Sequence, residues 1–255
     1  MLGVNAQTPL DNFNKLSPKC QDKVFPVSSG GSKDEKVSCT LNFADQGLIL
    51  VAGNTTSEDY APAANDHAFV YAIDLQGNWK WGKFFYNVSD AISTISGCSI
   101  DANGNAVFLG QGKAQQPIIM ELKPADGSVL KFISLEKEGS TDTDSPWFMT
   151  YGAIYHDLVD DYDGKGYYYA AFIMEDIMEV VKINTADNSI KWTYQFFETT
   201  GLATGDVYKN KKIPGMFVQD QDDNSRMYLF GQFGQRATAI KFSKVDMTVD
   251  WKTEV

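Results

Sequence analysis

Short segments in which apolar and polar residues alternate recur along the chain, separated by turns rich in Asp, Asn and Gly. Side chains of a strand point alternately to two faces, so this period of two predicts half-buried antiparallel β-strands. The alternating segments lie at residues 69–73, 118–122, 179–183 and 238–242. The pattern leaves little room for helices.

Each alternating segment belongs to a larger unit that is used four times. A unit has a turn, an apolar strand, a polar loop, the alternating strand and a second turn, and it ends on an apolar, a charged and an aromatic residue. The four endings are Trp79-Lys80-Trp81, Leu130-Lys131-Phe132, Ile190-Lys191-Trp192 and Val249-Asp250-Trp251. Self-similarity at a spacing of roughly fifty to sixty residues is typical of propellers and solenoids.

An upstream strand completes each unit, at residues 37–43, 96–100, 149–155 and 215–219. Four antiparallel strands are the content of one propeller blade, so we expect an all-β propeller with at least four blades. The predicted boundaries are an extended arm at 1–36 and repeats at about 37–90, 91–145, 146–205 and 206–255. We expect the closing aromatic residues to pack between blades; sugar-stacking platforms, and hence a glycan ligand, are the alternative.

Two parts of the chain resemble known repeat families. Residues 45–85, with the core Ala-Phe-Val-Tyr-Ala-Ile-Asp-Leu-Gln-Gly-Asn-Trp-Lys-Trp, are similar to the bacterial-type seven-bladed propeller repeat. Residues 183–192 resemble the quinoprotein-type repeat, although Asn184 replaces its aspartate and Asp187-Asn188 replace its Thr-Gly. The resemblance covers about residues 37–255 and implies a propeller fold. Its matching positions are turn and packing residues, so it transfers no catalytic residue.

Four complete units leave the closure of the ring open. Propellers close with four to eight blades, and the families resembled here carry more than four. Either the ring is compact, with the arm adding a strand such as residues 22–28, or the chain is part of a longer propeller. A third alternative is a protomer that completes its sheet edges with neighbours, because an unpaired edge is a template for assembly.

Charge and hydropathy limit the partners. The formal net charge is −11 and the sequence pI is about 4.6, so the phosphate backbone of a nucleic acid would repel the protein. No run approaches the ~20 apolar residues of a membrane span. Near the start, Val4 and Ala6 have the small-residue form of a signal-peptidase site, which predicts cleavage near Ala6 of a longer leader.

Cysteines and sequons extend the prediction of an extracellular protein. A bridge between Cys20 and Cys39 would close the Ser/Gly-rich arm in an oxidising compartment. The alternative is three separate thiols, with Cys39 and Cys98 as small core residues at equivalent places in their repeats. Asn54-Thr55-Thr56 and Asn87-Val88-Ser89 are candidate N-glycosylation sites, although such triplets also arise by chance.

Asp157, Asp160, Asp161 and Asp163 form the best candidate metal site, because calcium prefers several carboxylate and carbonyl oxygens in a flexible loop. The spacing does not match an EF-hand, and Asp and Asn occur in every equivalent turn. Tight-turn chemistry is therefore the competing interpretation. Beyond a possible calcium ion, no cofactor is predicted.

Groups for catalysis are few in the sequence. The two histidines, His67 and His156, belong to no nucleophile or metal motif, and the glycines are followed by strands instead of helices. We therefore expect a non-enzymatic secreted or cell-surface module that binds proteins or assembles with itself. The alternative is a quinoprotein-like or lyase-like enzyme, with a ligand in the central channel. Its lining would come from Trp147, Tyr151, His156, Asp157 and Lys209.

Overall fold

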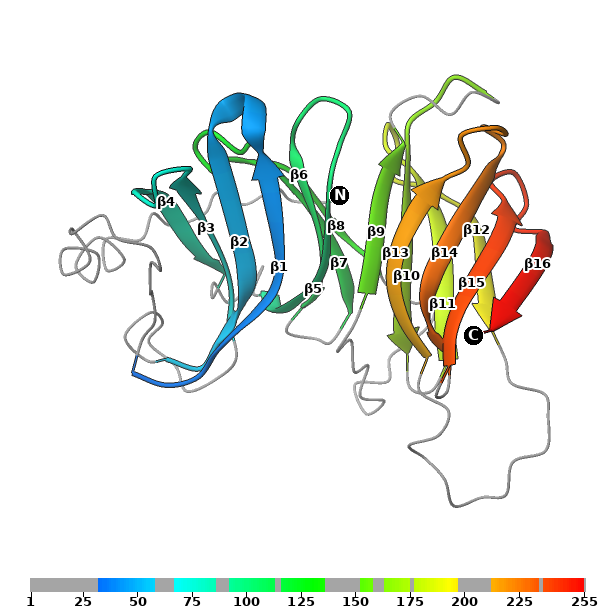
Figure 1. The fold of residues 1–255 in the computed structure, drawn as a ribbon, viewed down its shortest axis with the longest axis horizontal. Helices are drawn as coiled ribbons and strands as arrows, with labels where there is room; N and C mark the ends of the chain where they lie inside the picture. Colours follow the sequence, from blue (N-terminus) through cyan, green and yellow to red (C-terminus); the bar gives the residue numbers. More distant parts are fainter. Residues whose placement is uncertain are drawn as a thin grey trace, which may run out of the picture. The chain divides into compact units, whose positions relative to one another are not determined.

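The computed structural model describes nine stretches of the chain, and the strands lie in two compact units (Figure 1). The described stretches are residues 32–57, 67–85, 92–112, 116–135, 152–157, 163–174, 177–196, 212–233 and 236–254. Unit 1 comprises Met1–Ile100 and Gly104–Glu138, and unit 2 comprises Asp101–Asn103 and Gly139–Val255.

Unit 1 contains two four-stranded antiparallel sheets. Sheet A consists of β1 (Glu35–Phe43), β2 (Leu48–Thr55), β3 (His67–Asp74) and β4 (Trp79–Phe85), with a 3-10 turn at Ala44–Gln46. Sheet B consists of β5 (Ile92–Ile100), β6 (Ala106–Gly112), β7 (Pro117–Leu122) and β8 (Val129–Ser134).

Unit 2 repeats the same plan. Sheet C consists of β9 (Gly152–Asp157), β10 (Tyr167–Met174), β11 (Ile177–Asn184) and β12 (Ile190–Phe196). Sheet D consists of β13 (Lys212–Gln219), β14 (Arg226–Phe233), β15 (Arg236–Ser243) and β16 (Val249–Glu254). In every sheet, strands that follow one another along the chain are neighbours, which is the order within a propeller blade. The predicted all-β propeller with four-stranded blades is therefore confirmed.

A β-bulge at the same place in each sheet gives the four blades one common register. In each sheet the bulge comes directly after one pair of residues on the third and fourth strands. These pairs are Ala72–Trp81, Glu121–Lys131, Lys182–Trp192 and Lys241–Trp251. These four pairs are therefore structurally equivalent. The sequence alignment of sheet B was wrong by one residue, because Lys131 and not Phe132 occupies the tryptophan position. Phe132 instead pairs with Met120 and packs on the core of unit 1.

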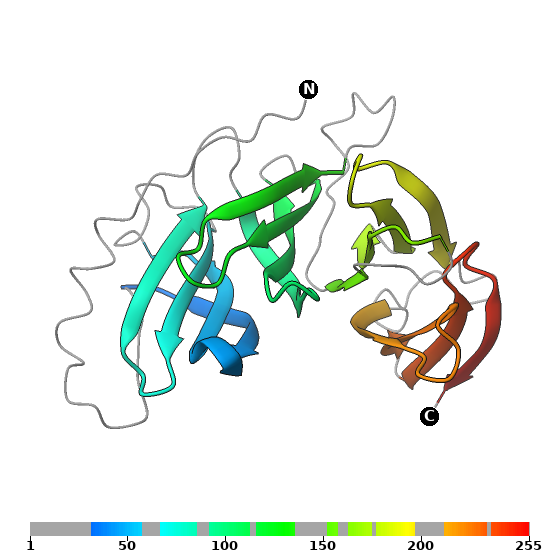
Figure 2. The same ribbon diagram turned by 90° about the horizontal axis from the view of Figure 1, so that it is seen from above.

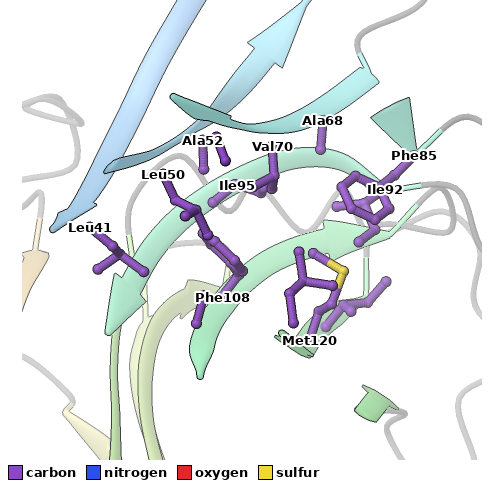
Figure 3. Close-up of a cluster of buried hydrophobic side chains, with 14 of the residues drawn as sticks. Leu41, Leu50, Ala52, Ala68, Val70, Phe85, Ile92, Ile95, Phe108 and Met120 are labelled. Carbon is purple, nitrogen blue, oxygen red and sulfur yellow. The ribbon is translucent and has the colours of Figure 1, made fainter. Parts of the chain in front are cut away.

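The two sheets of each unit lie side by side, as Figure 2 shows from above, and their apolar faces pack against each other. In unit 1, Leu50 and Val70 of sheet A meet Phe108 and Met120 of sheet B in one buried cluster (Figure 3). In unit 2, the corresponding cluster joins side chains of sheets C and D. Its aromatic and methionine members are Tyr167, Tyr169, Met178, Phe217, Met227, Phe242 and Met247. Burying these side chains supplies the main stabilisation of each pair of sheets.

A disulfide between Cys39 of β1 and Cys98 of β5 joins sheets A and B, with 6.3 Å between the Cα atoms. The predicted Cys20–Cys39 bridge is therefore wrong, and Cys20 lies outside the described residues. Cys39 and Cys98 are also not equivalent: Cys39 pairs with Ala52, whereas Cys98 pairs with Phe108, the equivalent of Val51. Adjacent positions on a strand point to opposite faces. The offset of one residue lets each sulfur point at the other sheet.

Other sequence predictions fall partly outside the described residues. Asn54 lies in β2, hydrogen-bonded between β1 and β3 and half-buried, whereas Asn87 is not described. Residues 1–31 of the predicted arm are likewise outside, so the domain boundaries and the leader remain predictions. Within the described stretches, no helix has the length and apolar character needed to cross a membrane.

Removing the disulfide should destabilise unit 1 strongly. The bridge spans 59 residues, and loop-closure entropy for that length corresponds to about 4 kcal/mol. We expect the double variant Cys39→Ala/Cys98→Ala to lose about that much free energy of unfolding in urea titrations. Cys20→Ala is the matched control and should leave the transition unchanged. Equal effects of the two changes would contradict the observed pairing.

Candidate interaction surface

A tryptophan in the fourth strand of one sheet binds the next sheet in both units. The indole Nε1 of Trp81 donates to the carbonyl oxygen of Pro124 at 2.8 Å, and that of Trp192 donates to the carbonyl oxygen of Lys244 at 3.1 Å. Leu122 in sheet B and Phe242 in sheet D are the third-strand residues that follow the bulge. Pro124 and Lys244 each lie two residues further along the chain, so they are structurally equivalent. The prediction that Trp81 and Trp192 pack between blades is therefore confirmed within each unit.

The turn that receives the tryptophan has a left-handed residue in both sheets. Gly127 has φ +66°, and a Cβ there would lie 2.6 Å from the Trp81 ring. Met247 has φ +62°, and its side chain is buried in the cluster that Trp192 joins. In sheet B the ring thus lies against bare backbone, and in sheet D a methionine packs beside it.

In unit 2, a lysine strengthens the contact between sheets C and D. The buried Lys182 donates from Nζ to the same Lys244 carbonyl at 2.9 Å. Its Nζ also lies 3.9 Å from the centre of the Tyr167 ring and 5.4 Å from that of Tyr169. A cation over the negative face of an aromatic ring is favourable, most strongly when water is excluded. Sheet C therefore holds sheet D by two donors on one carbonyl oxygen.

The side chain of Lys244 completes the junction in the opposite direction. Its Nζ lies 2.7 Å from Oδ2 of Asp157 and 3.4 Å from Oε1 of Gln219, and the lysine side chain is 1% exposed. Tyr155 approaches the same Gln219 oxygen at 3.5 Å. Burial, followed by the negative charge of Asp157, raises the pKa of the Tyr155 hydroxyl. The junction thus contains a desolvated ion pair, which is costly to break once formed.

Sheet D carries an equivalent set of residues on its face that points away from sheet C. By strand register, Tyr228, Lys241 and Trp251 are equivalent to Tyr169, Lys182 and Trp192. The ring of Tyr228 lies 5.9 Å from that of Trp251 and 6.0 Å from that of Phe230, and Lys241 lies over Tyr228. We call this face, with Met216 and Val218 of β13, the outer face of sheet D.

Asp220, which is equivalent to Asp157, pairs within its own sheet. Its Oδ2 lies 2.7 Å from Nζ of Lys241 and accepts a hydrogen bond from the Tyr228 hydroxyl at 3.1 Å. The bond from Lys241, followed by that from the Asp222 backbone, lowers the pKa of Asp220 to about 2. Asp220 also raises the pKa of Lys241. In sheet C, Lys182 and Asp157 bind the neighbouring sheet, whereas in sheet D the equivalent Lys241 and Asp220 bind each other.

Exposure distinguishes the two copies of the set. On the outer face of sheet D, Met216, Val218, Phe230 and Trp251 are 56%, 38%, 39% and 42% exposed. Their counterparts on sheet C include Ala153 and Ala171, each at most 2% exposed beneath sheet D. Within the described part of the chain, the Trp251 indole has no carbonyl acceptor of the kind that Trp192 has. These exposed apolar and aromatic side chains lie on one sheet face, which makes the outer face of sheet D the candidate interaction surface.

The predicted calcium site is only partly described. The carboxylate of Asp157 lies against the Lys244 ammonium, which a bound cation would have to displace. Asp163 accepts hydrogen bonds from the Lys165 backbone and the Tyr167 hydroxyl, as expected for tight-turn chemistry. Asp160 and Asp161 lie outside the described residues, so the calcium site stays a prediction.

Of the two histidines and the residues expected to line a channel, the structure describes His67, His156 and Asp157. His156 is buried, and its ring lies 4.6 Å from that of Tyr168 in the neighbouring strand. His67 is buried at the start of β3. Trp147, Tyr151 and Lys209 are not described.

Sequence reasoning missed Lys182, Gln219 and Lys244. One signal was present: Lys182 and Lys241 each interrupt an apolar stretch of the third strand, immediately before its last apolar residue. No signal marks Lys244, because a lysine in a surface turn is ordinary until its neighbouring sheet is known.

Comparison with known proteins supports the fold alone. No protein-family model matches the sequence, and no curated protein matches it. The structure of the Dos1 propeller superposes with a TM-score of 0.51 at 7% identity, covering 87% of this chain and 48% of that one. Exotype rhamnogalacturonan lyase YesX (TM-score 0.45, 10% identity, 83% and 45% covered) and the Cellvibrio cellulosa alpha-L-arabinanase (0.39, 9%, 87% and 76%) are weaker matches. The chain thus spans about half the length of the Dos1 propeller chain, and it shares the β-propeller fold.

Replacing each tryptophan by phenylalanine should separate the buried contact from its exposed copy. Trp192→Phe removes the bond to the Lys244 carbonyl and should lower the free energy of unfolding by about 1 to 2 kcal/mol. Trp251→Phe makes the same chemical change on the outer face of sheet D and should stay within about 0.5 kcal/mol. Chemical denaturation of both variants measures the difference. Equal losses would show that the Trp192 hydrogen bond does not stabilise the junction.

The Asp220–Lys241 pair should make stability depend on pH in acid. Because the folded pKa of Asp220 is about 2 and its ordinary value is 3.8, its contribution is complete above the ordinary value. It disappears as pH falls through about 2. We expect the urea midpoint of the wild-type protein to exceed that of Asp220→Asn at pH 6, and the gap to narrow steadily towards pH 2. A gap independent of pH would rule out this ionic contribution.

Proposed function

We propose that this chain is a non-enzymatic β-propeller module of the extracellular space, which binds protein partners through the outer face of sheet D. One observation carries the proposal: the residues with which sheet C holds sheet D recur on sheet D, where they are exposed. Tyr, Trp and Arg are the residues that most often dominate protein interfaces. A face rich in tyrosine, tryptophan and phenylalanine around one internally neutralised ion pair suits a protein partner.

The polar groups of unit 2 support a structural role over a catalytic one. Lys182 binds the Lys244 carbonyl and Lys244 binds Asp157 across the junction of sheets C and D, and Lys244 also binds Gln219 of its own sheet. They hold two sheets together, whereas a catalytic group must be directed at a substrate. The Cys39–Cys98 disulfide is consistent with an oxidising compartment and hence with the extracellular assignment.

Photo-cross-linking in the native source would test this function. A p-benzoylphenylalanine introduced at Trp251 or Phe230 should capture a protein neighbour, because both positions lie on the outer face. The same label at Lys165, an exposed turn residue of sheet C, is the matched control and should capture little. Mass spectrometry identifies the adducts, including adducts with another copy. Absence of adducts at both outer-face positions, or equal yields at Lys165, would refute the proposal.

A further inference from the structure

We propose that Asn103 is a site of spontaneous deamidation, in which the backbone nitrogen of Gly104 displaces the side-chain amide of the asparagine. The turn between β5 and β6 carries this site, so it is independent of the proposed function of sheet D. The reactants are a carboxamide, a peptide nitrogen and water, and no enzyme or cofactor is required.

The sequence contains a single Asn-Gly pair, at Asn103-Gly104. A residue with a Cβ crowds the approach of its own backbone nitrogen to a preceding asparagine side chain, and glycine lacks this atom. Asn-Gly is also typical of the tight turn between two antiparallel strands. Asn103 lies in such a turn and is exposed, since Ile100 pairs with Ala106 on either side of it. Water and hydroxide therefore reach the reacting atoms.

The backbone nitrogen of Gly104 is free to react. Among the hydrogen bonds of the described stretches, none uses the Gly104 N–H as donor. The residue has φ +75°, and a Cβ placed on it would meet one described atom within 4 Å, the Gln46 Nε2 at 3.6 Å. The turn thus leaves space around the nucleophile.

Other asparagines in turns lack this combination. Ser189 follows Asn188 and Ser225 follows Asn224, and each serine N–H donates at 2.9 Å to Oδ1 of the aspartate two residues before it. Such a nitrogen must give up its hydrogen bond before it can attack, and serine also carries a Cβ. Asn224 is exposed as Asn103 is, so it is an internal control for exposure.

The reaction has two steps and consumes only water. In the first, the Gly104 nitrogen loses its proton to solvent and attacks Cγ of Asn103, and the new C–N bond closes a succinimide ring. The bond from Cγ to the side-chain nitrogen breaks, and that nitrogen leaves as ammonia. In the second, water opens the ring at either carbonyl carbon. Opening at Cγ leaves aspartate in an ordinary backbone, whereas opening at the backbone carbonyl leaves isoaspartate.

The two products differ in their effect on unit 1. Either product adds a negative charge to a protein whose net charge is −11. Isoaspartate also lengthens the backbone before Gly104 by a carbon atom. The Gly104 carbonyl accepts a hydrogen bond from Gln46 Nε2 at 3.4 Å, which links the turn after β1 to the turn after β5. Isoaspartate displaces this carbonyl and weakens the link, whereas aspartate leaves the backbone unchanged.

Ageing of the purified, folded protein tests the site. The wild-type chain is kept at neutral pH and physiological temperature, digested at intervals and mapped by mass spectrometry, which detects the change from amide to carboxyl. We expect Asn103 to lose its amide about tenfold faster than Asn188 and Asn224, since a difference of one hydrogen bond in the barrier corresponds to about that factor. A protease that cleaves before aspartate but not before isoaspartate resolves the two products.

Two variants identify the reacting groups. Asn103→Gln keeps an amide on a longer side chain that closes a ring far less readily, so the acidic species resolved by anion exchange should disappear. Gly104→Ala adds the crowding Cβ and should slow conversion about tenfold. Circular dichroism establishes that both variants are folded. Equal rates at Asn103 and Asn224 in the wild-type chain, or an acidic species that persists in Asn103→Gln, would overturn the proposal.

Discussion

The structure depends on one constraint: the main apolar face of each four-stranded sheet must be covered by another surface. A β-sheet with an uncovered apolar face of this size is not stable in water, so each sheet needs a partner sheet inside its unit. The chain meets this requirement within each unit by the same means, in which a tryptophan donates to a turn carbonyl of the following sheet. The indole combines a large apolar area with one N–H, so it fills the space between the sheets and fixes their register.

The two units differ in how much charge they bury around this contact. Between sheets A and B the turn residue is a proline and the sheets are also linked by a disulfide. Between sheets C and D the turn residue is Lys244, and an ion pair with Asp157 takes the place of the covalent link. A buried ion pair adds little net stability, but a wrong neighbour would leave a charge unpaired. We infer that the charges between sheets C and D specify which sheets pack together, whereas the disulfide mainly adds stability.

The sequence was sufficient for the fold because strand alternation and turn residues are local properties. The four strands of each sheet and the role of Trp81 and Trp192 followed from that pattern. The register of sheet B could not be predicted in this way. Leu130-Lys131-Phe132 matches the sequence motif, but the bulge places Lys131, and not Phe132, at the tryptophan position opposite Glu121. The prediction of the disulfide was wrong for a similar reason. Cys98 can meet Cys39 only if the two side chains point towards each other from sheets B and A. A shift of one residue along a strand reverses the face to which a side chain points, and the sequence does not show this shift.

Equivalent residues have different partners in sheets C and D. In sheet C, Lys182 and Asp157 both bind atoms of Lys244 in the next sheet, so neither needs the other. In sheet D, Lys241 turns to Asp220, and the pair stays neutral next to the exposed rings of Tyr228 and Trp251. A charged pair on an exposed sheet face discourages indiscriminate apolar association. It also leaves the Trp251 ring exposed beside the neutral pair, as the proposed function requires.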